Sequence, residues 1–317
     1  MRGWWRDLTD LVLPAECGGC GRPRAVLCAE CRAALSGAAP SRVRPVPEPA
    51  GLPAVHAAAP YTDEVRAVLL AHKERGALAL AAPLGAALAG AVRAALEAAR
   101  RPGPAGRPVA SQGRLRHGRG EAGCEREWPE RDGAGVRGAG PGDGAVLLVP
   151  VPSARRAVRA RGHDPARRIA LAAAGELRRT GTPARVLGVL RHRRAVADQS
   201  GLNSRQRSDN LAGALEVTGG GVRLLAGGGR VVLVDDLMTT GASLTEAARA
   251  VREAQAAAEG VCAARERPER PARPARPELP EVDGRIVGRG QARGTRGGTV
   301  CSAVVAAPPD AFEINRN

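Results

Sequence analysis

The segment 231-VVLVDDLMTTGAS-243 constrains the fold more than any other part of the chain. Val231 to Val234 form an apolar run typical of a short strand that is buried on both faces of a parallel sheet. Two adjacent carboxylates, Asp235 and Asp236, follow the run at once, and a Thr-Thr-Gly turn comes next. Two neighbouring like charges are costly unless something binds them. A solvated turn that caps the next helix explains only part of this pattern, so the segment predicts a ligand site at the end of a buried strand.

Strands and helices alternate along much of the chain. We expect strands near Val55, at 146–152, near 185–190, at 231–235 and at 300–309, and helices at about 63–71, 78–99, 165–179 and 243–257. This alternation predicts an α/β fold with a parallel sheet and flanking helices on both faces. Ligands of such sheets bind beyond the carboxyl ends of the strands. The two aspartates therefore lie on the expected functional edge.

Two low-complexity stretches, 101–144 and 263–299, interrupt this pattern. Both are rich in Gly, Pro and charge, and neither has a hydrophobic period that could bury apolar surface, so we expect both to be disordered. The proline spacing of the second favours an extended, partly polyproline II chain. The predicted organisation is a small N-terminal segment, 1–40, followed by an α/β domain, 53–317, into which the two stretches are inserted.

The chain is strongly basic, with 48 Lys and Arg residues against 32 Asp and Glu residues, and Lys73 is its only lysine. Between Ser153 and Asp209 there are 14 arginines and 4 acidic residues, which supply ten of the sixteen net positive charges. This concentration indicates an anionic ligand, either the phosphates of a small molecule or a nucleic-acid backbone. A generic solvated surface is the alternative explanation.

The sequence predicts a cytoplasmic protein with no membrane partner. No run of about 20 apolar residues could cross a bilayer. The mildly apolar segment 78–96 contains Arg93 and many Ala and Gly residues, which favour a buried helix. The N-terminus has neither the apolar core nor the cleavage site of a signal peptide.

Four cysteines near the N-terminus follow the pattern C-x2-C-x7-C-x2-C: Cys17, Cys20, Cys28 and Cys31. Each C-x2-C pair can place two thiolates on one tetrahedral metal ion, so the spacing predicts a zinc ribbon with a structural Zn²⁺. Four protein thiolates leave no open position for catalysis. Redox-active cysteines are the alternative, although paired cysteines in a cytoplasmic protein more often bind metal than form disulfides.

The segment 231–243 resembles the loop with which type I phosphoribosyltransferases bind phosphoribosylpyrophosphate (PRPP). The order of zinc ribbon and α/β domain is similar to that of the ComF family, which is associated with DNA uptake in competent bacteria. Four further matches support this resemblance: 11-LVLPAECGGCGRP-23, the residues Tyr61, Lys73 and Gly76, the run 150-PVPSARRAVRARGHD-164, and 199-QSGLNSRQRSDNLAGAL-215. The chain departs from the family pattern at Asp164, Pro165 and Leu215.

The resemblance implies a type I phosphoribosyltransferase-like sheet and a role for each site residue. Asp235 and Asp236 would be catalytic, accept hydrogen bonds from the ribose hydroxyls and hold Mg²⁺. The PRPP 5′-phosphate would bind the residues that follow: Thr239, Thr240, Gly241, Ala242 and Ser243. Arg155, Arg156, Arg159 and Arg161 are the candidates for binding the pyrophosphate, and Arg155 and Arg161 are the two assigned to it. If a helix begins at 242–243, its dipole and free amides also favour an anion there. Residues 191–210 would be either a loop that closes over the site or a plain surface loop.

Two functions remain open at the level of sequence. The first is Mg²⁺-dependent binding of PRPP or a related ribose 5-phosphate, with transfer of the phosphoribosyl group to or from a nitrogenous base. The second is a non-catalytic accessory role in DNA uptake, with single-stranded DNA or a helicase-like protein as partner. The few aromatic residues count against autonomous single-strand binding. A P-loop ATPase is excluded because the chain has no Gly-Lys-Ser/Thr sequence.

Overall fold

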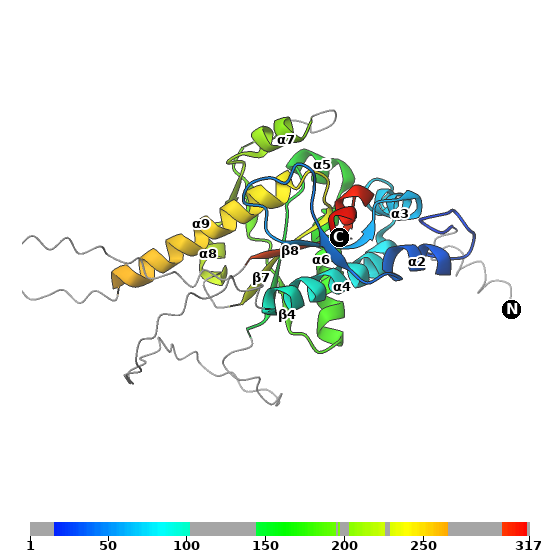
Figure 1. The fold of residues 1–317 in the computed structure, drawn as a ribbon, viewed down its shortest axis with the longest axis horizontal. Helices are drawn as coiled ribbons and strands as arrows, with labels where there is room; N and C mark the ends of the chain where they lie inside the picture. The colour runs from blue at the N-terminus through cyan, green and yellow to red at the C-terminus, as the bar shows by residue number, and fades with distance from the viewer. Residues whose placement is uncertain are drawn as a thin grey trace, which may run out of the picture.

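The computed structural model describes residues 16–101, 144–194, 196, 203–225, 229–265 and 300–315 (Figure 1). Residues 102–143 and 266–299, which make up almost all of the two low-complexity stretches, lie outside these ranges, as does the beginning of the N-terminal segment. The disorder predicted for 101–144 and 263–299 therefore falls almost entirely outside the described residues.

A six-stranded sheet forms the centre of the described fold. Its strands, in spatial order, are β1 (Ser41–Val43), β2 (Val55–Pro60), β8 (Cys301–Ala307), β7 (Arg230–Leu237), β3 (Val146–Pro150) and β4 (Ala184–Val186). All neighbours are parallel except β1 and β2, which are antiparallel. The aliphatic run of β7 is fully buried, and Val232, Leu233 and Val234 each have no exposed surface. The predicted mixed α/β fold with a mostly parallel sheet is confirmed.

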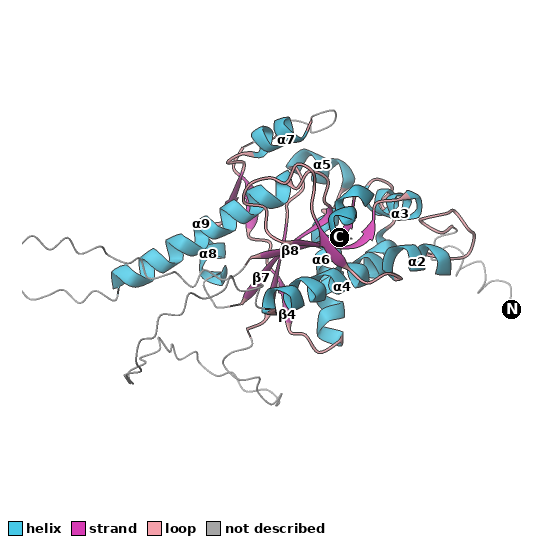
Figure 2. Ribbon diagram, viewed as in Figure 1, coloured by secondary structure: helices cyan, strands magenta, loops and turns pink. Residues whose placement is uncertain are grey.

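Helices cover both faces of this sheet (Figure 2). On one face lie α2 (Ala29–Ser36), α3 (Asp63–Lys73), the short η1 (Leu78–Leu80), α4 (Ala81–Arg100) and α6 (Pro165–Arg179). On the other face lie α8 (Gly219–Leu225) and α9 (Ala242–Arg265). The remaining elements are α5 (Arg155–Arg161), η2 (Pro309–Asn315), and an arm made of β5 (Leu190–His192), α7 (Ser204–Leu211) and β6 (Leu215–Val217).

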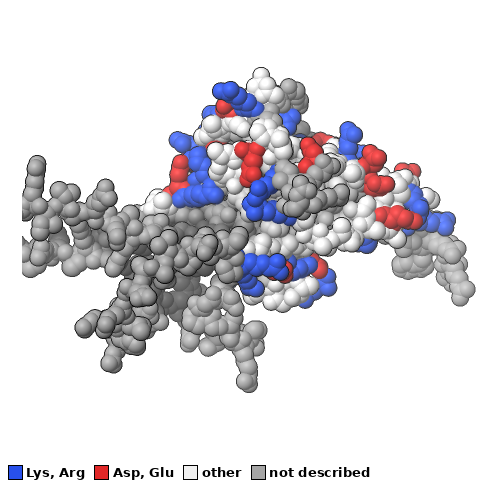
Figure 3. Space-filling model, in the orientation of Figure 1, with Lys and Arg blue, Asp and Glu red and all other residues white. Residues whose placement is uncertain are grey.

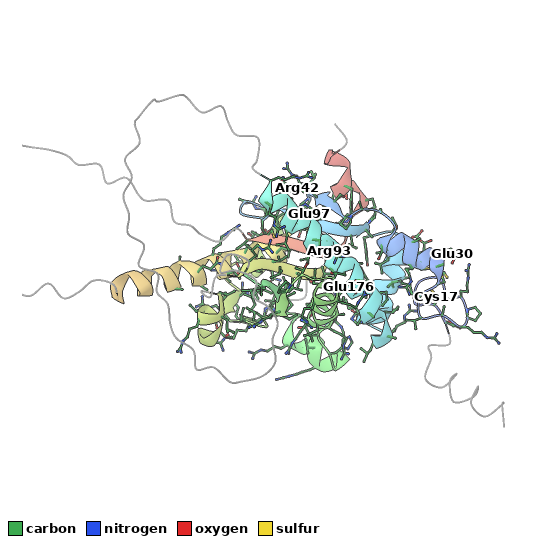
Figure 4. All side chains as sticks on the ribbon, turned by 90° about the horizontal axis from the view of Figure 1, so that it is seen from below. Cys17, Glu30, Arg42, Arg93, Glu97 and Glu176 are labelled. Carbon is green, nitrogen blue, oxygen red and sulfur yellow. The ribbon has the colours of Figure 1, made fainter. Side chains whose placement is uncertain are left out.

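Helix α4 is the central helix of its layer. Together with η1 it is the one segment, within the described ranges, that is long and apolar enough to cross a membrane, yet 56% of its apolar window is buried inside the fold. It packs against α6, and Arg93 Nη1 donates a hydrogen bond of 3.2 Å to Thr180 Oγ1 at the end of α6. Figure 4 shows Arg93 on this helical layer and Cys17 at the far end of the molecule. The segment is thus a core helix, as its composition predicted.

The contact between α4 and α6 depends on Gly85. A Cβ atom at this position would lie 2.4 Å from Ala172 Cβ and 2.8 Å from the backbone of α6. The Gly85→Ala variant must therefore separate the two helices, and we expect it to lose about 1–3 kcal/mol of unfolding free energy. Denaturant unfolding measures this loss. Gly175→Ala on α6 is the matched control, because a Cβ there meets no atom within 4 Å.

One predicted strand and one predicted helix have different bounds in the structure. The single strand expected near 185–190 is two strands: β4 extends the main sheet, whereas β5 pairs with β6 in a separate antiparallel ribbon. The last helix, α9, begins at Ala242 as expected but continues to Arg265 instead of ending near residue 257. Its additional residues include Ala258, Ala263 and Ala264, and alanine has the highest intrinsic helix propensity.

Candidate functional site

A cavity of about 970 Å³ opens at the carboxyl edge of the sheet. Its floor is the end of β7, where Asp235, Asp236 and Thr239 line it, with Ser243 from the start of α9. Lys73 comes from α3, and Arg156 and Arg161 come from α5, which follows β3. The arm closes one side with His192, Val196, Leu211 and Leu215. Segments far apart in sequence therefore meet at the edge where the sequence predicted a ligand.

The two aspartates have different surroundings. Asp236 is 7% exposed, and its Oδ2 lies 3.0 Å from Lys73 Nζ in an ion pair. Asp235 is half-buried, and its Oδ1 accepts a hydrogen bond of 2.9 Å from the Asp236 amide. No cationic side chain of the described residues forms an ion pair with Asp235. Desolvation and the neighbouring Asp236 charge raise the pKa of Asp235 well above its usual value.

Lys73 is the cation of this pair. Burial alone would lower the pKa of Lys73, but Asp236 and Asp235 raise it above the ordinary value, so the ammonium stays charged. Together, Asp235, Asp236 and Lys73 bring two carboxylates and one ammonium to the cavity. One negative charge is left uncompensated when both carboxylates are ionised. Hard oxygen donors with residual negative charge suit Mg²⁺.

The loop that joins β7 to α9 is shaped to accept an anion. Met238 anchors it because its side chain is buried and its amide donates to the Ala306 carbonyl oxygen, while Thr239 is exposed. Gly241 has φ +77°, and a Cβ there would lie 3.1 Å from Leu52 Cδ1, so the turn requires glycine. Because α9 begins at Ala242, its first amides have no intrahelical acceptor, and they form the positive end of the helix dipole.

Arginines supply positive charge opposite the carboxylates. Arg161 Nε donates to Glu74 Oε2 at 3.1 Å, whereas its Nη1 is buried and has no hydrogen-bond partner among the described residues. Arg156 also lines the cavity. Arg155, the other arginine predicted from the sequence, is exposed and does not line it. An unsatisfied buried donor is costly, so Arg161 favours an anionic ligand that would accept from it.

The arm contributes a further arginine to the loop. Arg207 Nη1, from α7, donates to Thr239 Oγ1 at 3.2 Å, and its buried Nε has no partner within the described chain. Helix α7 is itself well defined by a capping box between Asn203 and Gln206. The segment 191–210 is therefore not a plain loop, because it includes the end of β5 and most of α7.

A buried carboxylate holds the arm onto the body of the protein. Glu246 on α9 is 5% exposed and accepts a hydrogen bond of 2.9 Å from the Leu215 amide. Arg249 neutralises it at 2.8 Å and also donates to the Leu215 carbonyl oxygen. Although burial raises the pKa of Glu246, these partners lower it below the usual value. The network fixes β6 beside the cavity.

The four N-terminal cysteines form a second candidate site, for a metal ion. Their sulfur atoms all lie within 4.8 Å of one another, and none of the four is in a disulfide. Zn–S bonds of about 2.3 Å in a tetrahedron place sulfurs about 3.8 Å apart, so the cluster fits a zinc ion. Although burial raises the pKa of Cys17, hydrogen bonds from backbone amides, Cys28 first, lower it to about 6. The predicted ligand set is brought together as a unit.

Of the residues predicted for the anion site, the structure brings Asp235, Asp236, Thr239, Ser243 and Arg161 to the cavity wall, while Thr240, Gly241 and Ala242 complete the loop beside it. Sequence reasoning did not select Lys73 or Arg207 as site residues, and it named Arg156 as one of four candidate arginines without assigning it to the site. For Lys73 a signal was present, since it is the one lysine among 48 basic residues. Neither protein-family models nor curated proteins give a match to this chain, so the site is interpreted from its own geometry.

Proposed function

We propose that the chain is a ComF-like protein of the type I phosphoribosyltransferase group that binds PRPP, or a related ribose 5-phosphate, together with Mg²⁺. One observation carries this proposal. Asp235, Asp236, Thr239 and Ser243 follow one another along the wall of one cavity, and the Gly241 turn beside that wall leads into the start of α9. A ribose 5-phosphate offers hydroxyls and a phosphate in the matching order.

Each part of the ligand has a partner in this arrangement. The ribose hydroxyls donate to Asp235 and Asp236, which can only accept when ionised. The 5′-phosphate accepts hydrogen bonds from the first amides of α9 and from Thr239, which lies in the loop before it. The pyrophosphate faces Arg161, whose buried Nη1 lacks a partner among the described residues.

Mg²⁺ would be held by the oxygens of Asp235 and Asp236, and when bound it supplies positive charge that stabilises the departing pyrophosphate. In the transfer, the C1–O bond to pyrophosphate breaks and its electron pair leaves with pyrophosphate. A nitrogen lone pair of the base forms the new C1–N bond, and the base N–H proton leaves to solvent. The aspartates favour the positive charge that develops on the sugar. Positioning carries the rest of the rate, without a nucleophilic side chain.

The accessory role in DNA uptake is the second candidate, favoured by exposed arginines on α5. Arg155 and Arg159 are exposed, and neither forms an ion pair with a described residue. On the face shown in Figure 3, however, basic and acidic side chains are interspersed instead of forming one broad basic field. A phosphate-backbone ligand would give binding that weakens steeply with salt.

The test of the proposed function follows PRPP itself. Calorimetric titration of PRPP should give saturable binding that requires Mg²⁺, and pyrophosphate release should be measured with a panel of nitrogenous bases. Absence of PRPP binding at millimolar concentration would refute the proposal. Mg²⁺-dependent binding with no pyrophosphate release, accompanied by salt-sensitive binding of an oligothymidylate, would favour the accessory role instead.

Arg207 gives a further prediction within this function. Because it donates to Thr239 Oγ1, it orients that hydroxyl and adds positive charge to the 5′-phosphate site. We expect Arg207→Gln to weaken ribose 5-phosphate binding by about tenfold, the effect of one charge-assisted hydrogen bond. Arg205→Gln on the same helix is the matched control, because Arg205 is exposed. Equal affinities of the two variants, measured by calorimetry, would remove Arg207 from the site.

A further inference from the structure

Lys73 stands apart from the other basic residues of the chain. The remaining 47 are arginines, yet the cation in contact with the candidate carboxylate pair is the one lysine. A guanidinium binds a carboxylate through two parallel hydrogen bonds, whereas an ammonium is a compact point charge on a flexible stem. The side chain at position 73 therefore suits a contact that must be released.

Contacts of the neighbouring residues hold the backbone at Lys73 in place, whereas its side chain is partly exposed at the cavity. Lys73 is the last residue of α3. The preceding carbonyl, that of His72, lies 3.3 Å from His163 Nε2, and the following residue, Glu74, pairs with Arg161. The Lys73 side chain is 34% exposed and lines the cavity. A rotation about its own bonds can carry the ammonium from Asp236 toward the cavity without shifting α3.

We propose that Lys73 is the resting counter-ion of the site: it holds the place beside Asp236 that a divalent cation takes when a phosphorylated ligand binds, and its ammonium then turns to the ligand's phosphates. The second half of this inference rests on the proposed function. The first half concerns only the protein and a metal ion. In the resting site Lys73 offsets one of the two carboxylate charges, so a divalent cation that arrives alone must compete with an ammonium already at 3.0 Å.

This exchange predicts opposite effects for two substitutions. Lys73→Gln removes the competing charge, so a divalent cation should bind the ligand-free protein more tightly, by roughly tenfold. Lys73→Arg provides a guanidinium that can hold Asp236 through two hydrogen bonds, so the same cation should bind more weakly than in the wild type. A residue with only a structural role would not separate the two variants in this way.

The experiment is a Mn²⁺ titration of the full chain, followed by electron paramagnetic resonance, without any phosphate present. Mn²⁺ serves as the probe because it shares the preference of Mg²⁺ for oxygen ligands. Arg75→Gln is the control for the loss of one positive charge, because Arg75 is exposed two residues beyond Lys73 and does not line the cavity. The affinity for Mn²⁺ should be highest in Lys73→Gln, intermediate in the wild type and in Arg75→Gln, and lowest in Lys73→Arg. Equal affinities of Lys73→Gln and the Arg75→Gln control would overturn the proposal.

A second measurement uses the fact that the chain contains one lysine. Competitive acetylation followed by peptide mass spectrometry reports the reactivity of Lys73 alone. Asp236→Asn should raise its acetylation rate severalfold, because the contact with Asp236 shields the amine. Mg²⁺ with inorganic pyrophosphate should alter the wild-type rate, and an unchanged rate would reject the transfer of the ammonium to phosphate. If the Mn²⁺ order holds but PRPP does not bind, the proposed function fails and the counter-ion role stands.

Discussion

Replacing Cys20 with Ser should release the metal ion and lower the melting temperature almost as much as replacing Cys31 with Ser. We expect zinc content to fall from about one ion per chain to a small fraction in both variants, with a loss of more than about 3 kcal/mol of unfolding free energy. For a domain of this size that corresponds to a fall of about 6–12 °C. Elemental analysis and thermal unfolding measure the two effects.

Comparing the Cys20→Ser and Cys31→Ser variants separates the loss of metal binding from the loss of packing. Cys31 is 1% exposed, and its Sγ lies 2.6 Å from where a Cβ on Gly19 would be, so its replacement also disturbs the core. Cys20 is exposed, so its replacement loses little packing. If the cluster bound no metal ion, Cys31→Ser would be the destabilising variant of these two and Cys20→Ser would have little effect. Cys301→Ser is the control, because Cys301 is buried in β8 and is not part of the cluster. A stable Cys20→Ser variant, or wild-type protein purified without chelator that contains no zinc, would reject the zinc site.

The cysteine cluster is also connected to the cavity through α3. A Cβ at Gly19 would lie 3.3 Å from Val68 on α3, and a Cβ at Gly18 would lie 2.6 Å from Leu80 in η1. The ribbon therefore packs tightly on the helix whose last residue is Lys73. We infer that the metal stabilises the helix that presents Lys73. The cysteine cluster would then support the site by stabilising α3, although the four cysteines leave no coordination position of the metal ion open to a ligand.

Local patterns explain which elements could be predicted from the sequence. Helix α6 spans 165–179 as expected, because Asp164 accepts a hydrogen bond of 3.1 Å from the Arg167 amide and Pro165 occupies the first turn. The loop after β7 was predictable because its determinants are also neighbours in the sequence: the aliphatic run, Gly241 and the start of the helix are contiguous. The C-x2-C pairs likewise fix their own geometry.

Contacts between distant residues explain what the sequence did not provide. Lys73 and Asp236 are 163 positions apart, and Arg207 and Thr239 are 32 apart. Neither pair has a periodic signal, because each depends on how α3 or the arm docks on the sheet. The split of the expected strand near 185–190 into β4 and β5 is similar, since β5 finds its partner, β6, only after α7. The arginine surplus was evident, but which arginine lines the cavity was not: Arg156 does, and Arg155 does not.

Asp235→Asn and Asp236→Asn should each weaken Mg²⁺-dependent PRPP binding by about 10- to 100-fold, and the double variant should abolish it. Each substitution keeps the size of the side chain but removes the negative charge that a cation and the ribose hydroxyls require. Calorimetry in the presence of Mg²⁺ measures the loss. Asp310→Asn is the control, because Asp310 is exposed and does not line the cavity. Identical binding by the wild type and the double variant would refute the proposed role of the pair.

The same variants should change the stability of the ligand-free protein in opposite directions. Asp236→Asn leaves the Lys73 ammonium without its carboxylate and should be destabilising. Asp235 has a raised pKa, so its contribution to stability is full below its unfolded pKa of about 3.9 and is lost as the pH rises through the folded value. Asp235→Asn should therefore raise the melting temperature at pH 7.5, and the gain should disappear near pH 4. A carboxylate that lowers stability at neutral pH indicates a ligand-binding function, because a bound cation would offset its cost. A lower melting temperature for Asp235→Asn at pH 7.5 would mean that Asp235 has a structural partner and would remove this argument for the site.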